Sequence, residues 1–533
     1  MTKPIPNSII WFKRDLRVED NAALCEALLH GSTTALYVIE PALWQQSDRS
    51  ARHWHLCRHH LLGLQQQLAR LGGGLTVRVG EMTTVLSQLH RELGHFELFA
   101  HEETGSQWTF SRDQAVLDWC RSNGIAWHEY AQFGVVRGLK DRDGWAKLWR
   151  QRMQLDTAKL PPHRHWQPLP STPDWESWQP NRSDRDNVFG ALEPLDASAW
   201  QVHKAQATAV LDDFLTQRGE RYHLEMSSPH SAVSACSRLS AHLAYGSLSM
   251  RSLVQATWQR QKAVKTLPAT ERRTWPKALS AFHGRLHWHC HFMQKLESEP
   301  ALEFRNFSKM YDGMREDCFN PAHFAAWCRG ETGYPFVDAC MRFLIANGWI
   351  NFRMRAMLVS FASYDLWLHW RETAHYLARL FLDYETGIHY SQVQMQSGTT
   401  GINTVRIYNP VKQSKDQDPN GNFIRRWVPE LSGFDDTLVH QPWLATTAQQ
   451  TQAGCLIGEH YPAPIVDHAI AARYAREQVY ARRRGAEAQA EHARVFEQHG
   501  SRKNNPRSTS RQSRKPREAS PQLDLLEKPK SNV

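Results

Sequence analysis

Residues 330–372 read GETGYPFVDACMRFLIANGWINFRMRAMLVSFASYDLWLHWRE, and residues 382–410 read LDYETGIHYSQVQMQSGTTGINTVRIYNP. The first stretch opens with a glycine- and proline-rich turn, after which apolar residues recur at helical spacing, as at Phe336, Cys340 and Phe343. This spacing predicts a buried helix, and the Asn-Gly turn that follows should lead into another. We therefore expect this half of the chain to be built from helices.

Two arginines, Arg353 and Arg355, interrupt the apolar and aromatic run of the second predicted helix. An arginine is rarely buried without an anionic partner, and Asp383 and Glu385 are the best nearby candidates. Helices with paired charges beside a glycine- and threonine-rich turn suit a cavity for a large, polar, aromatic ligand. A helical core with a structural ion pair also explains the spacing.

Composition limits the class of protein. A chain of 533 residues is long enough for two or more domains with their own cores. No apolar run approaches the length of a membrane span, and the N-terminus lacks a signal-peptide pattern, so we expect a cytoplasmic protein without a membrane partner. The nine cysteines are scattered without a C-x-x-C pair, which fits neither a disulfide framework nor a zinc module.

Near the N-terminus, short β-rich runs alternate with helical segments such as 53–71 and 109–122. This alternation predicts an α/β domain with a Rossmann-like parallel sheet covered on both faces. No G-x-G-x-x-G follows the first strand, so a nicotinamide phosphate site has no support. The predicted strands are residues 8–12, 33–39, 75–79, 96–100 and 125–130.

Changes of composition divide the rest of the chain. The α/β domain should cover residues 1–135, a connector rich in Pro and Trp residues 136–203, and an all-α domain residues 204–495. Residues 496–533 should form a basic, disordered tail, because from Ser501 onward nine Lys/Arg face three Asp/Glu and aromatics are absent. Such a tail suits nonspecific contact with polyanions or a specific arm for DNA or a partner.

Several strings in the helical half resemble the flavin-binding core of the cryptochrome/photolyase family. They are ETGYP, the helix ending in Trp370-Arg371-Glu372, the Asp-x-Glu at 383 and 385, RIYNP, and FIRRWVPEL at 423–431, in this order. The first strand ends in WFKRDLRVEDNAAL (11–24), which resembles the entry of the family's antenna domain. The resemblance runs from Ile9 to about Leu431 and implies an all-α domain that binds FAD behind the α/β domain.

The resemblance also implies which residues hold FAD. The run 236–240 is similar to the family's T-S-R-L-S loop for the flavin diphosphate, with Cys236 in place of the threonine. Small hydroxyl residues at a helix N-terminus form an anion site, whereas an ordinary helix cap would explain a single serine but not the whole string. The expected FAD contacts are Tyr222, Cys236, Ser237, Arg238, Leu239, Ser240, Arg355, Asp383, Glu385 and His389.

The expected catalytic and DNA-facing residues follow from the same resemblance. The helix 282–296 matches the family helix whose tryptophan faces the lesion, here Trp288. Arg353 and Arg406 match arginines that photolyases turn toward DNA, where they would bind phosphates. His389 stands where many photolyases place an asparagine near flavin N5, and it can donate or accept a proton near neutral pH.

Departures from the family pattern concern electron transfer and the lesion pocket. Val393 and Asp317 replace two tryptophans of the usual three-member chain, and only the middle one, Trp370, remains. Trp367, Trp327, Trp349 and Tyr390 are alternative routes that spacing does not separate. The best-known dimer photolyases place a glutamate and an arginine on the Trp288 helix. The altered pocket positions in this chain are Arg285, His289, Ala356 and Met395.

Two further sites were weighed from the sequence. Glu102 and Glu103, after the fourth predicted strand, are candidates for contacting an antenna chromophore, a methenyltetrahydrofolate or a deazaflavin. A solvated acidic helix start is the other explanation. His287 and His291 share a helix face, but no third ligand is placed by sequence, so we expect no metal.

Two functions of different classes remain. The first is a light-driven DNA photolyase, a carbon–carbon lyase that flips a pyrimidine dimer out of DNA and splits it by electron transfer from reduced FAD. The second is a cryptochrome-like blue-light photoreceptor that signals to a partner through the C-terminal tail. A third alternative is a flavoprotein that binds nucleic acid without light chemistry. The basic balance favours the first, and the altered pocket favours the second.

Overall fold

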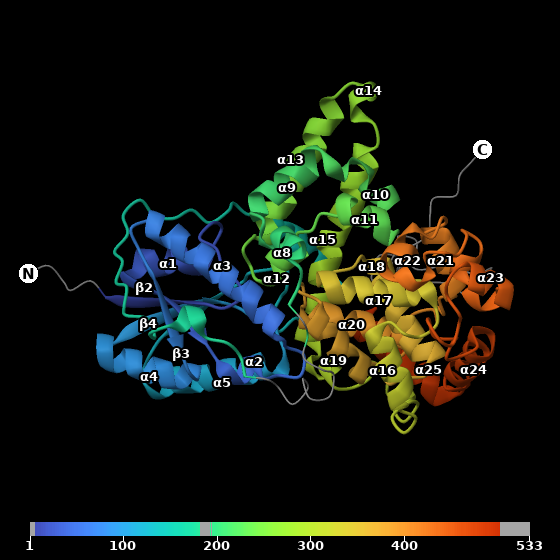
Figure 1. Ribbon diagram of the computed structural model, residues 1–533. Coiled ribbons are helices and arrows are strands. Elements are labelled where there is room, and N and C mark those ends of the chain that lie inside the picture. The colour runs from blue at the N-terminus through green and yellow to red at the C-terminus, as the bar shows by residue number, and fades with distance from the viewer. Residues whose placement is uncertain (1–5, 182–191, 193, 501–533) are drawn as a thin grey trace, which may run out of the picture.

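The computed structural model describes residues 6–181, 192 and 194–500. It consists of an N-terminal α/β part, blue in Figure 1, and a larger helical part that packs against it. This arrangement confirms the predicted fold class. The predicted tail from residue 501 onward lies outside the described residues, and the last helix runs to His499, past the composition boundary at 496.

A five-stranded parallel sheet forms the N-terminal part, with strand order β3-β2-β1-β4-β5. Residues of β1 alternate between its two faces: Ile10 and Phe12 pack in one apolar core, and Ile9 and Trp11 in the other. Helices α1 and α3 cover the first face, and α4 and α5 cover the second (Figure 1). The strands are β1 (Asn7–Phe12), β2 (Ser32–Ile39), β3 (Leu75–Val79), β4 (Phe96–His101) and β5 (Trp127–Tyr130). The helices are α1 (Ala22–His30), α2 (Pro41–Trp44), α3 (Ala51–Arg70), α4 (Met82–Leu93) and α5 (Gln107–Ser122).

The segment between the two parts runs back along the sheet. It contains α6 (Trp145–Gln154) and the short helix η1 (Trp175–Ser177). Main-chain hydrogen bonds tie it to the sheet, with Gln167 N donating to Thr33 O at 2.9 Å and Thr172 N to Val77 O at 2.7 Å. These bonds satisfy backbone groups at the sheet's side and hold the connector against the domain.

The helical part divides into two cores. Helices α9, α13 and α15 form a projecting core that stands above the body in Figure 1, and α17 to α20 form the central one. The first group contains α8 (Ala197–Lys204), α9 (Ala207–Thr216), η2 (Arg218–Arg221), α10 (Tyr222–Glu225), α11 (Pro229–Ala235), α12 (Ser240–Ala244), α13 (Met250–Thr266), α14 (Ala269–Arg272), α15 (Trp275–Ser298), η3 (Pro300–Glu303) and η4 (Lys309–Tyr311). The second contains α16 (Pro321–Arg329), α17 (Pro335–Asn347), α18 (Phe352–Ser360), η5 (Phe361–Asp365), α19 (Trp370–Leu380), α20 (Thr386–Ser397), α21 (Pro410–Gln417), α22 (Asn422–Trp427), η6 (Pro429–Leu431), η7 (Leu438–His440), η8 (Pro442–Leu444), α23 (Thr447–Gln452), α24 (His468–Ala481) and α25 (Ala486–His499).

Glycine and proline set the ends of the helices predicted in the opening stretch. Gly330 ends α16 and Gly348 ends α17, both with left-handed backbone (φ 65° and 64°). Pro335 occupies the first turn of α17, where its missing N–H costs no helical hydrogen bond. No helix in the described ranges is both long and apolar enough to cross a membrane.

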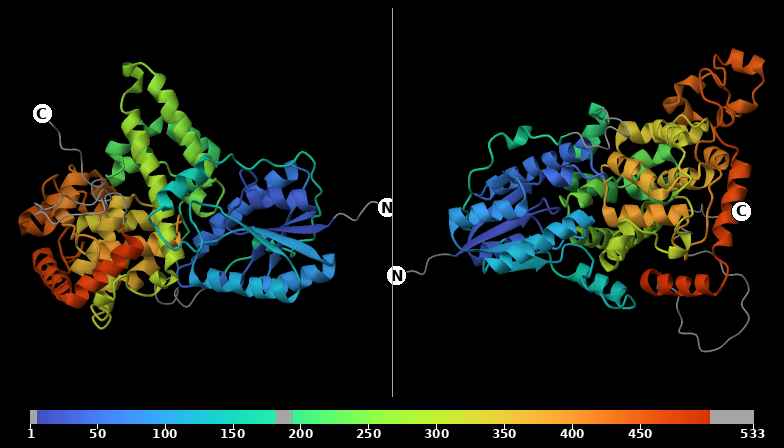
Figure 2. Two further views of the ribbon diagram at one scale, coloured as in Figure 1. Left: turned by 180° about the vertical axis from the view of Figure 1, so that it is seen from behind. Right: turned by 90° about the horizontal axis from the view of Figure 1, so that it is seen from below.

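The helices of the central core lie beside the α/β part, and the C-terminal helices α24 and α25 lie on the side away from the sheet (Figure 2). Helix α20 lies between α15 and α18, and its Gly387 lies against Met293 of α15. A methyl group at Gly387 would stand 2.9 Å from the Met293 backbone, so this glycine permits the close approach of the two helices. The approach brings residues about a hundred positions apart onto one site.

Candidate active site

A cavity lies between α18, α19 and α20. Residues of α18 form one wall, the connection between α19 and α20 forms a second, and α20 forms the third. Its lining is largely apolar with a few charged and amide groups, which is the usual character of a cofactor site. The lining residues are Phe352, Arg355, Ala356, Val359, Leu377, Phe381, Asp383, Tyr384, Glu385, Ile388, His389, Gln392, Val393 and Gln396.

The ion pair expected for Arg355 is present at the edge of this cavity. Its Nη2 donates to both carboxylate oxygens of Asp383, at 3.0 and 2.8 Å, and its Nε donates to the carbonyl of Ile350 at 2.8 Å. Burial raises the pKa of Asp383, but Arg355, helped by the Ser240 hydroxyl and by His203, brings the net pKa below its usual value. Asp383 is therefore a fixed anion that holds Arg355 in place.

Glu385 pairs with a residue of α15 and not with an arginine. Its Oε2 lies 2.6 Å from His289 Nε2, and both side chains are almost fully buried. Burial alone would lower the pKa of His289, yet the adjacent carboxylate raises it to about 10. His289 is consequently an imidazolium at neutral pH, and the pair joins α15 to the start of α20.

His389 has the opposite charge state. Its Nε2 donates to the carbonyl of Ala374 at 2.9 Å, because a carbonyl oxygen can only accept. This bond leaves Nδ1 as the acceptor nitrogen of the ring. Burial lowers the pKa of His389 to about 4, so the ring is neutral at physiological pH. One side of the cavity therefore has the charged His289–Glu385 pair, and another side has the neutral His389.

The loop 236–240 lies beside the same ion pair. Asp383 accepts a hydrogen bond from the side chain of Ser240, the first residue of α12. Arg238 has left-handed backbone (φ 60°), and its guanidinium lies 3.9 Å from the centre of the Trp349 ring. Arg218 donates to the carbonyl of Ser237 at 2.7 Å. The loop is therefore held from three sides and meets the Arg355–Asp383 pair.

Tyr222 and Cys236 lie together at the outer end of this loop. Both are close to Arg285 of α15, which hydrogen-bonds the phenol of Tyr222 and lowers the pKa of both side chains. Burial has the larger effect and raises the pKa of Tyr222 to about 12 and that of Cys236 to about 11. Both groups are neutral, and Arg285 is the cation nearest to them on α15.

The residues expected to face DNA and the lesion do not line the cavity themselves. Arg353, on the same helix as Arg355, and Arg406 are both half-buried and both lower the pKa of the Tyr408 phenol against the effect of burial. The two arginines, 53 positions apart in sequence, therefore share one neighbour. Trp288 is 9% exposed and stacks on Phe292 at 5.8 Å.

The retained tryptophan Trp370 is completely enclosed. Its indole N–H donates to Asn306 Oδ1 at 2.7 Å, and its ring lies 6.1 Å from Tyr390. Tyr390 in turn lies 5.3 Å from His389, which lines the cavity. Of the routes left open by spacing, this one forms a continuous aromatic path from the cavity to Trp370.

A second pocket opens where the α/β part meets the helical part. It lies beyond the carboxyl ends of β1 and β2, where ligands of parallel sheets bind. Glu103 lines it and pairs with Arg112 at 2.6 Å, whereas Glu102 does not line it and lies near Arg137. Burial raises the pKa of Glu40 to about 7 against the effect of Arg112, and one buried oxygen of Glu40 has no hydrogen-bond partner among the described residues.

This second pocket contains residues that sequence reasoning missed. Trp44 and Arg49, just before α3, line it together with Tyr384, which also lines the first cavity. The Trp44 indole N–H is buried without a hydrogen-bond partner among the described residues. Their position after the second strand was the available signal, because β1 and β2 are neighbours whose carboxyl ends meet at one edge.

The first cavity fits a flavin dinucleotide. Arg355, Asp383 and Glu385 line it with polar groups for a ring edge, and the loop at Ser240 offers hydroxyl and amide donors for a diphosphate. Gln392 Oε1 is buried and has no hydrogen-bond partner among the described residues, so the cavity holds an acceptor that a ring N–H would satisfy. An α/β domain joined to a helical domain with this cavity defines a class of two-domain flavoproteins.

Comparison with known proteins specifies the class. Residues 282–481 match the model of the FAD binding domain of DNA photolyase, and residues 8–136 match the DNA photolyase model. A deoxyribodipyrimidine photo-lyase of Vibrio cholerae is 30% identical over 482 residues, covering 86% of this chain and 96% of the relative. Cryptochrome-2 of Gallus gallus is 27% identical over 492 residues, covering 87% of this chain and 81% of the relative. The chain therefore belongs to the photolyase/cryptochrome family, as its motifs indicated, and is an FAD protein.

Solved structures agree with the fold. A class III photolyase from Agrobacterium tumefaciens superimposes with a TM-score of 0.72 at 26% identity, covering 91% of this chain and 98% of that chain. A photolyase from Sulfolobus tokodaii, described with two FAD molecules, has a TM-score of 0.69 at 24% identity over 89% of this chain and all of that chain. At this identity the second likeness shows the fold alone.

The histidine pair considered for a metal has other contacts. His287 packs against Trp145 at 5.0 Å, and His291 accepts a hydrogen bond from Arg142 at 3.0 Å. Within the described part of the chain, no three His, Cys, Asp or Glu side chains are grouped to hold a metal ion.

Proposed function

We propose that this protein is a DNA photolyase that repairs pyrimidine dimers under blue light, with FAD held between Ser240 and the Arg355–Asp383 pair. When bound in its reduced form, FAD supplies a light-excited electron donor. The observation that carries the proposal is the placement of Arg353 and Arg406 around Tyr408, with Arg353 on α18 two residues before the cavity-lining Arg355. Two half-exposed cations that share one neighbour and lie on or near a helix of the cofactor cavity suit a phosphate backbone.

The chain's own residues would position both cofactor and lesion. The Arg355–Asp383 pair fixes the ring edge, and the neutral His389 offers an acceptor nitrogen beside it. The apolar walls at Val359 and Phe381 exclude water, which strengthens each charge interaction inside the cavity. A flipped pyrimidine dimer would meet the ring of Trp288 as it enters.

His289 replaces an arginine as the positive group of the lesion pocket. Glu385 keeps it protonated at neutral pH, with Nε2 on the carboxylate. Its Nδ1 lies 4.0 Å from Cys290 Sγ, and it can exchange that weak sulfur contact for a stronger acceptor. A donor of this kind can bind a pyrimidine carbonyl and select the lesion by a directed polar contact.

The second pocket supports an antenna chromophore as a further proposal. Cations that include Arg49 and Arg112, the carboxylates of Glu40 and Glu103, and the Trp44 indole N–H, which has no hydrogen-bond partner among the described residues, surround one space. A heterocycle with both donors and acceptors would satisfy the buried oxygen of Glu40 and this N–H together. Tyr384 separates this space from the flavin cavity, so two chromophores would lie on either side of one ring.

A cryptochrome-like photoreceptor without repair activity is the second candidate. The observation that favours it is the burial of Met395 and Ala356, which stand where the best-known photolyases have larger lesion-contacting groups. In that case light-driven reduction would be signalled to a partner through the C-terminal tail.

One experiment separates the two functions. Purified FAD-loaded protein is illuminated with dimer-containing oligonucleotide, and restored pyrimidines are counted against a dark control. The photolyase proposal expects repair that is lost when Arg353 and Arg406 are both replaced by Ala. Light-dependent change of flavin absorption without repair would reject the photolyase and favour the receptor.

A further inference from the structure

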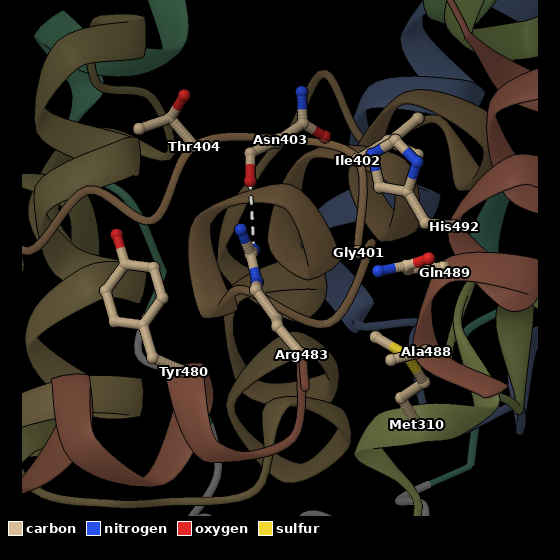
Figure 3. A pocket seen from close by; sticks show the side chains of 10 residues that line it. All are labelled: Met310, Gly401, Ile402, Asn403, Thr404, Tyr480, Arg483, Ala488, Gln489 and His492. Carbon is tan, nitrogen blue, oxygen red and sulfur yellow. Dashed lines mark hydrogen bonds between the residues drawn. The ribbon is translucent and has the colours of Figure 1, made fainter. Parts of the chain in front are cut away.

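A groove of about 480 Å³ lies at the C-terminal edge of the helical part, where α24 and α25 meet the loop Gly401–Thr404 (Figure 3). Helix α25 begins at Ala486, beyond the residues matched by the FAD-binding family model. The groove therefore includes an element that the family match does not account for, and it is separate from both pockets described above.

The walls of the groove are fixed by hydrogen bonds. Arg483 Nε donates to the Tyr311 hydroxyl at 2.8 Å, and its Nη2 donates to the carbonyl of Asn403 at 3.0 Å (Figure 3). On α25, Arg494 donates to the carbonyl of Phe307 at 3.0 Å. A cavity held in this way is organised before a ligand arrives, which lowers the cost of ordering on binding.

The groups that face the groove favour an anion. Arg483 contributes a guanidinium, and Figure 3 shows the amide of Gln489 and the ring of His492 on the α25 side. The side chains of Gln489, His492 and Tyr480 make no hydrogen bond within the described part of the chain. Among the described residues that line the groove there is no carboxylate. These groups can supply several hydrogen-bond donors to a phosphate.

Aromatic faces accompany the donors. Tyr480 is 46% exposed, with the Arg483 guanidinium 5.7 Å from its ring centre. His492 stacks on the exposed ring of Phe496 at 6.4 Å and 6°. Cationic groups interleaved with exposed rings are the features that bind unpaired nucleotides, through the phosphate and the base face respectively.

The loop also connects the groove to the expected DNA contact. Thr404 lines the groove, and Arg406 follows two residues later on the same loop. We propose that the groove between α24, α25 and loop 401–404 binds unpaired nucleotides of a DNA strand that continues past Arg406. This inference rests on the proposed function, since a strand must be held at Arg353 and Arg406 for its continuation to reach the groove.

The test measures binding of dye-labelled oligothymidylate to the FAD-loaded protein by fluorescence anisotropy in the dark. The test variant is Gln489→Glu, which puts a carboxylate in the groove. The matched control is Ala490→Glu, which makes the same charge change at an exposed neighbour that does not line the groove. Gln489→Glu should weaken binding about tenfold, and Ala490→Glu less than about twofold. Unchanged flavin-release temperatures establish that both variants fold.

Equal affinities for the two variants would overturn the proposal, as would a wild-type protein that does not bind oligothymidylate. Thymidine monophosphate is titrated in parallel. If Gln489→Glu abolishes binding of the mononucleotide but leaves the oligonucleotide unaffected, the groove serves free nucleotides and the strand proposal is rejected. The repair assay reports separately on the lesion site. If the wild-type protein does not repair dimers but Gln489→Glu still weakens oligothymidylate binding selectively, the photolyase proposal is rejected and the groove proposal is retained.

Discussion

The buried His289–Glu385 pair gives the most demanding prediction. The two atoms lie 2.6 Å apart, and the side chains are 10% and 4% exposed. Removing one member of a buried pair strands the other charge, which costs about 3–5 kcal/mol. We therefore expect His289→Gln and Glu385→Gln each to lower the temperature of flavin release, by about 6–10 °C at roughly 2 °C per kcal/mol for a domain of this size.

The double-mutant cycle isolates the interaction. With both residues replaced by Gln no charge is left unpaired, so the double variant should be more stable than the sum of the single effects predicts, with a coupling of about 3 kcal/mol. The exposed pair Arg329–Glu331 is the matched control. Its atoms are also 2.6 Å apart, but its side chains are 60% and 42% exposed, so its coupling should stay below about 1 kcal/mol.

The pH dependence of the coupling follows from the pKa of His289. The folded-state pKa of about 10 lies above the ordinary value of 6.5, so the stabilisation is fully present below pH 6.5 and is lost as the pH rises toward 10. About half of this stabilisation should remain at pH 8.5. A coupling no larger than that of Arg329–Glu331, or one that does not change between pH 6.5 and pH 9, would refute the assignment of a charged histidine.

Three further predictions concern the cofactor. Asp383→Asn strands Arg355 beside the cavity and should reduce FAD affinity by about a hundredfold or more, measured by fluorescence titration of the apoprotein; retention of wild-type affinity would contradict the ring-edge role. His389→Asn replaces an acceptor nitrogen by an amide and should change the visible spectrum of the flavin after illumination. An unchanged spectrum would exclude a role of His389 beside the flavin ring. Trp370→Phe should slow photoreduction at least tenfold if Tyr390 leads to it; an unchanged rate would direct the search to another route.

Much of the architecture could be predicted from the sequence, because it depends on local pattern. Alternating β-rich and helical runs set the five parallel strands, and glycines at 330 and 348 set the ends of two helices. The arginine doublet also predicted a buried ion pair, since a guanidinium in an apolar run requires an anion. These signals lie within a few residues of the feature that they specify.

The partners in the site were decided only by the tertiary structure. By spacing alone Asp383 and Glu385 were equivalent partners for an arginine, and only the family resemblance favoured Asp383 for Arg355. The structure pairs Asp383 with Arg355 and Glu385 with His289, 96 positions away. The difference arises because α15 packs on α20 at Gly387, which brings His289 to Glu385. Likewise, Glu103 lines the second pocket and Glu102 does not, because successive residues along an extended chain point to opposite sides. The residue types show which ion pairs and pocket contacts are possible. Helix packing and side-chain direction decide which of them form.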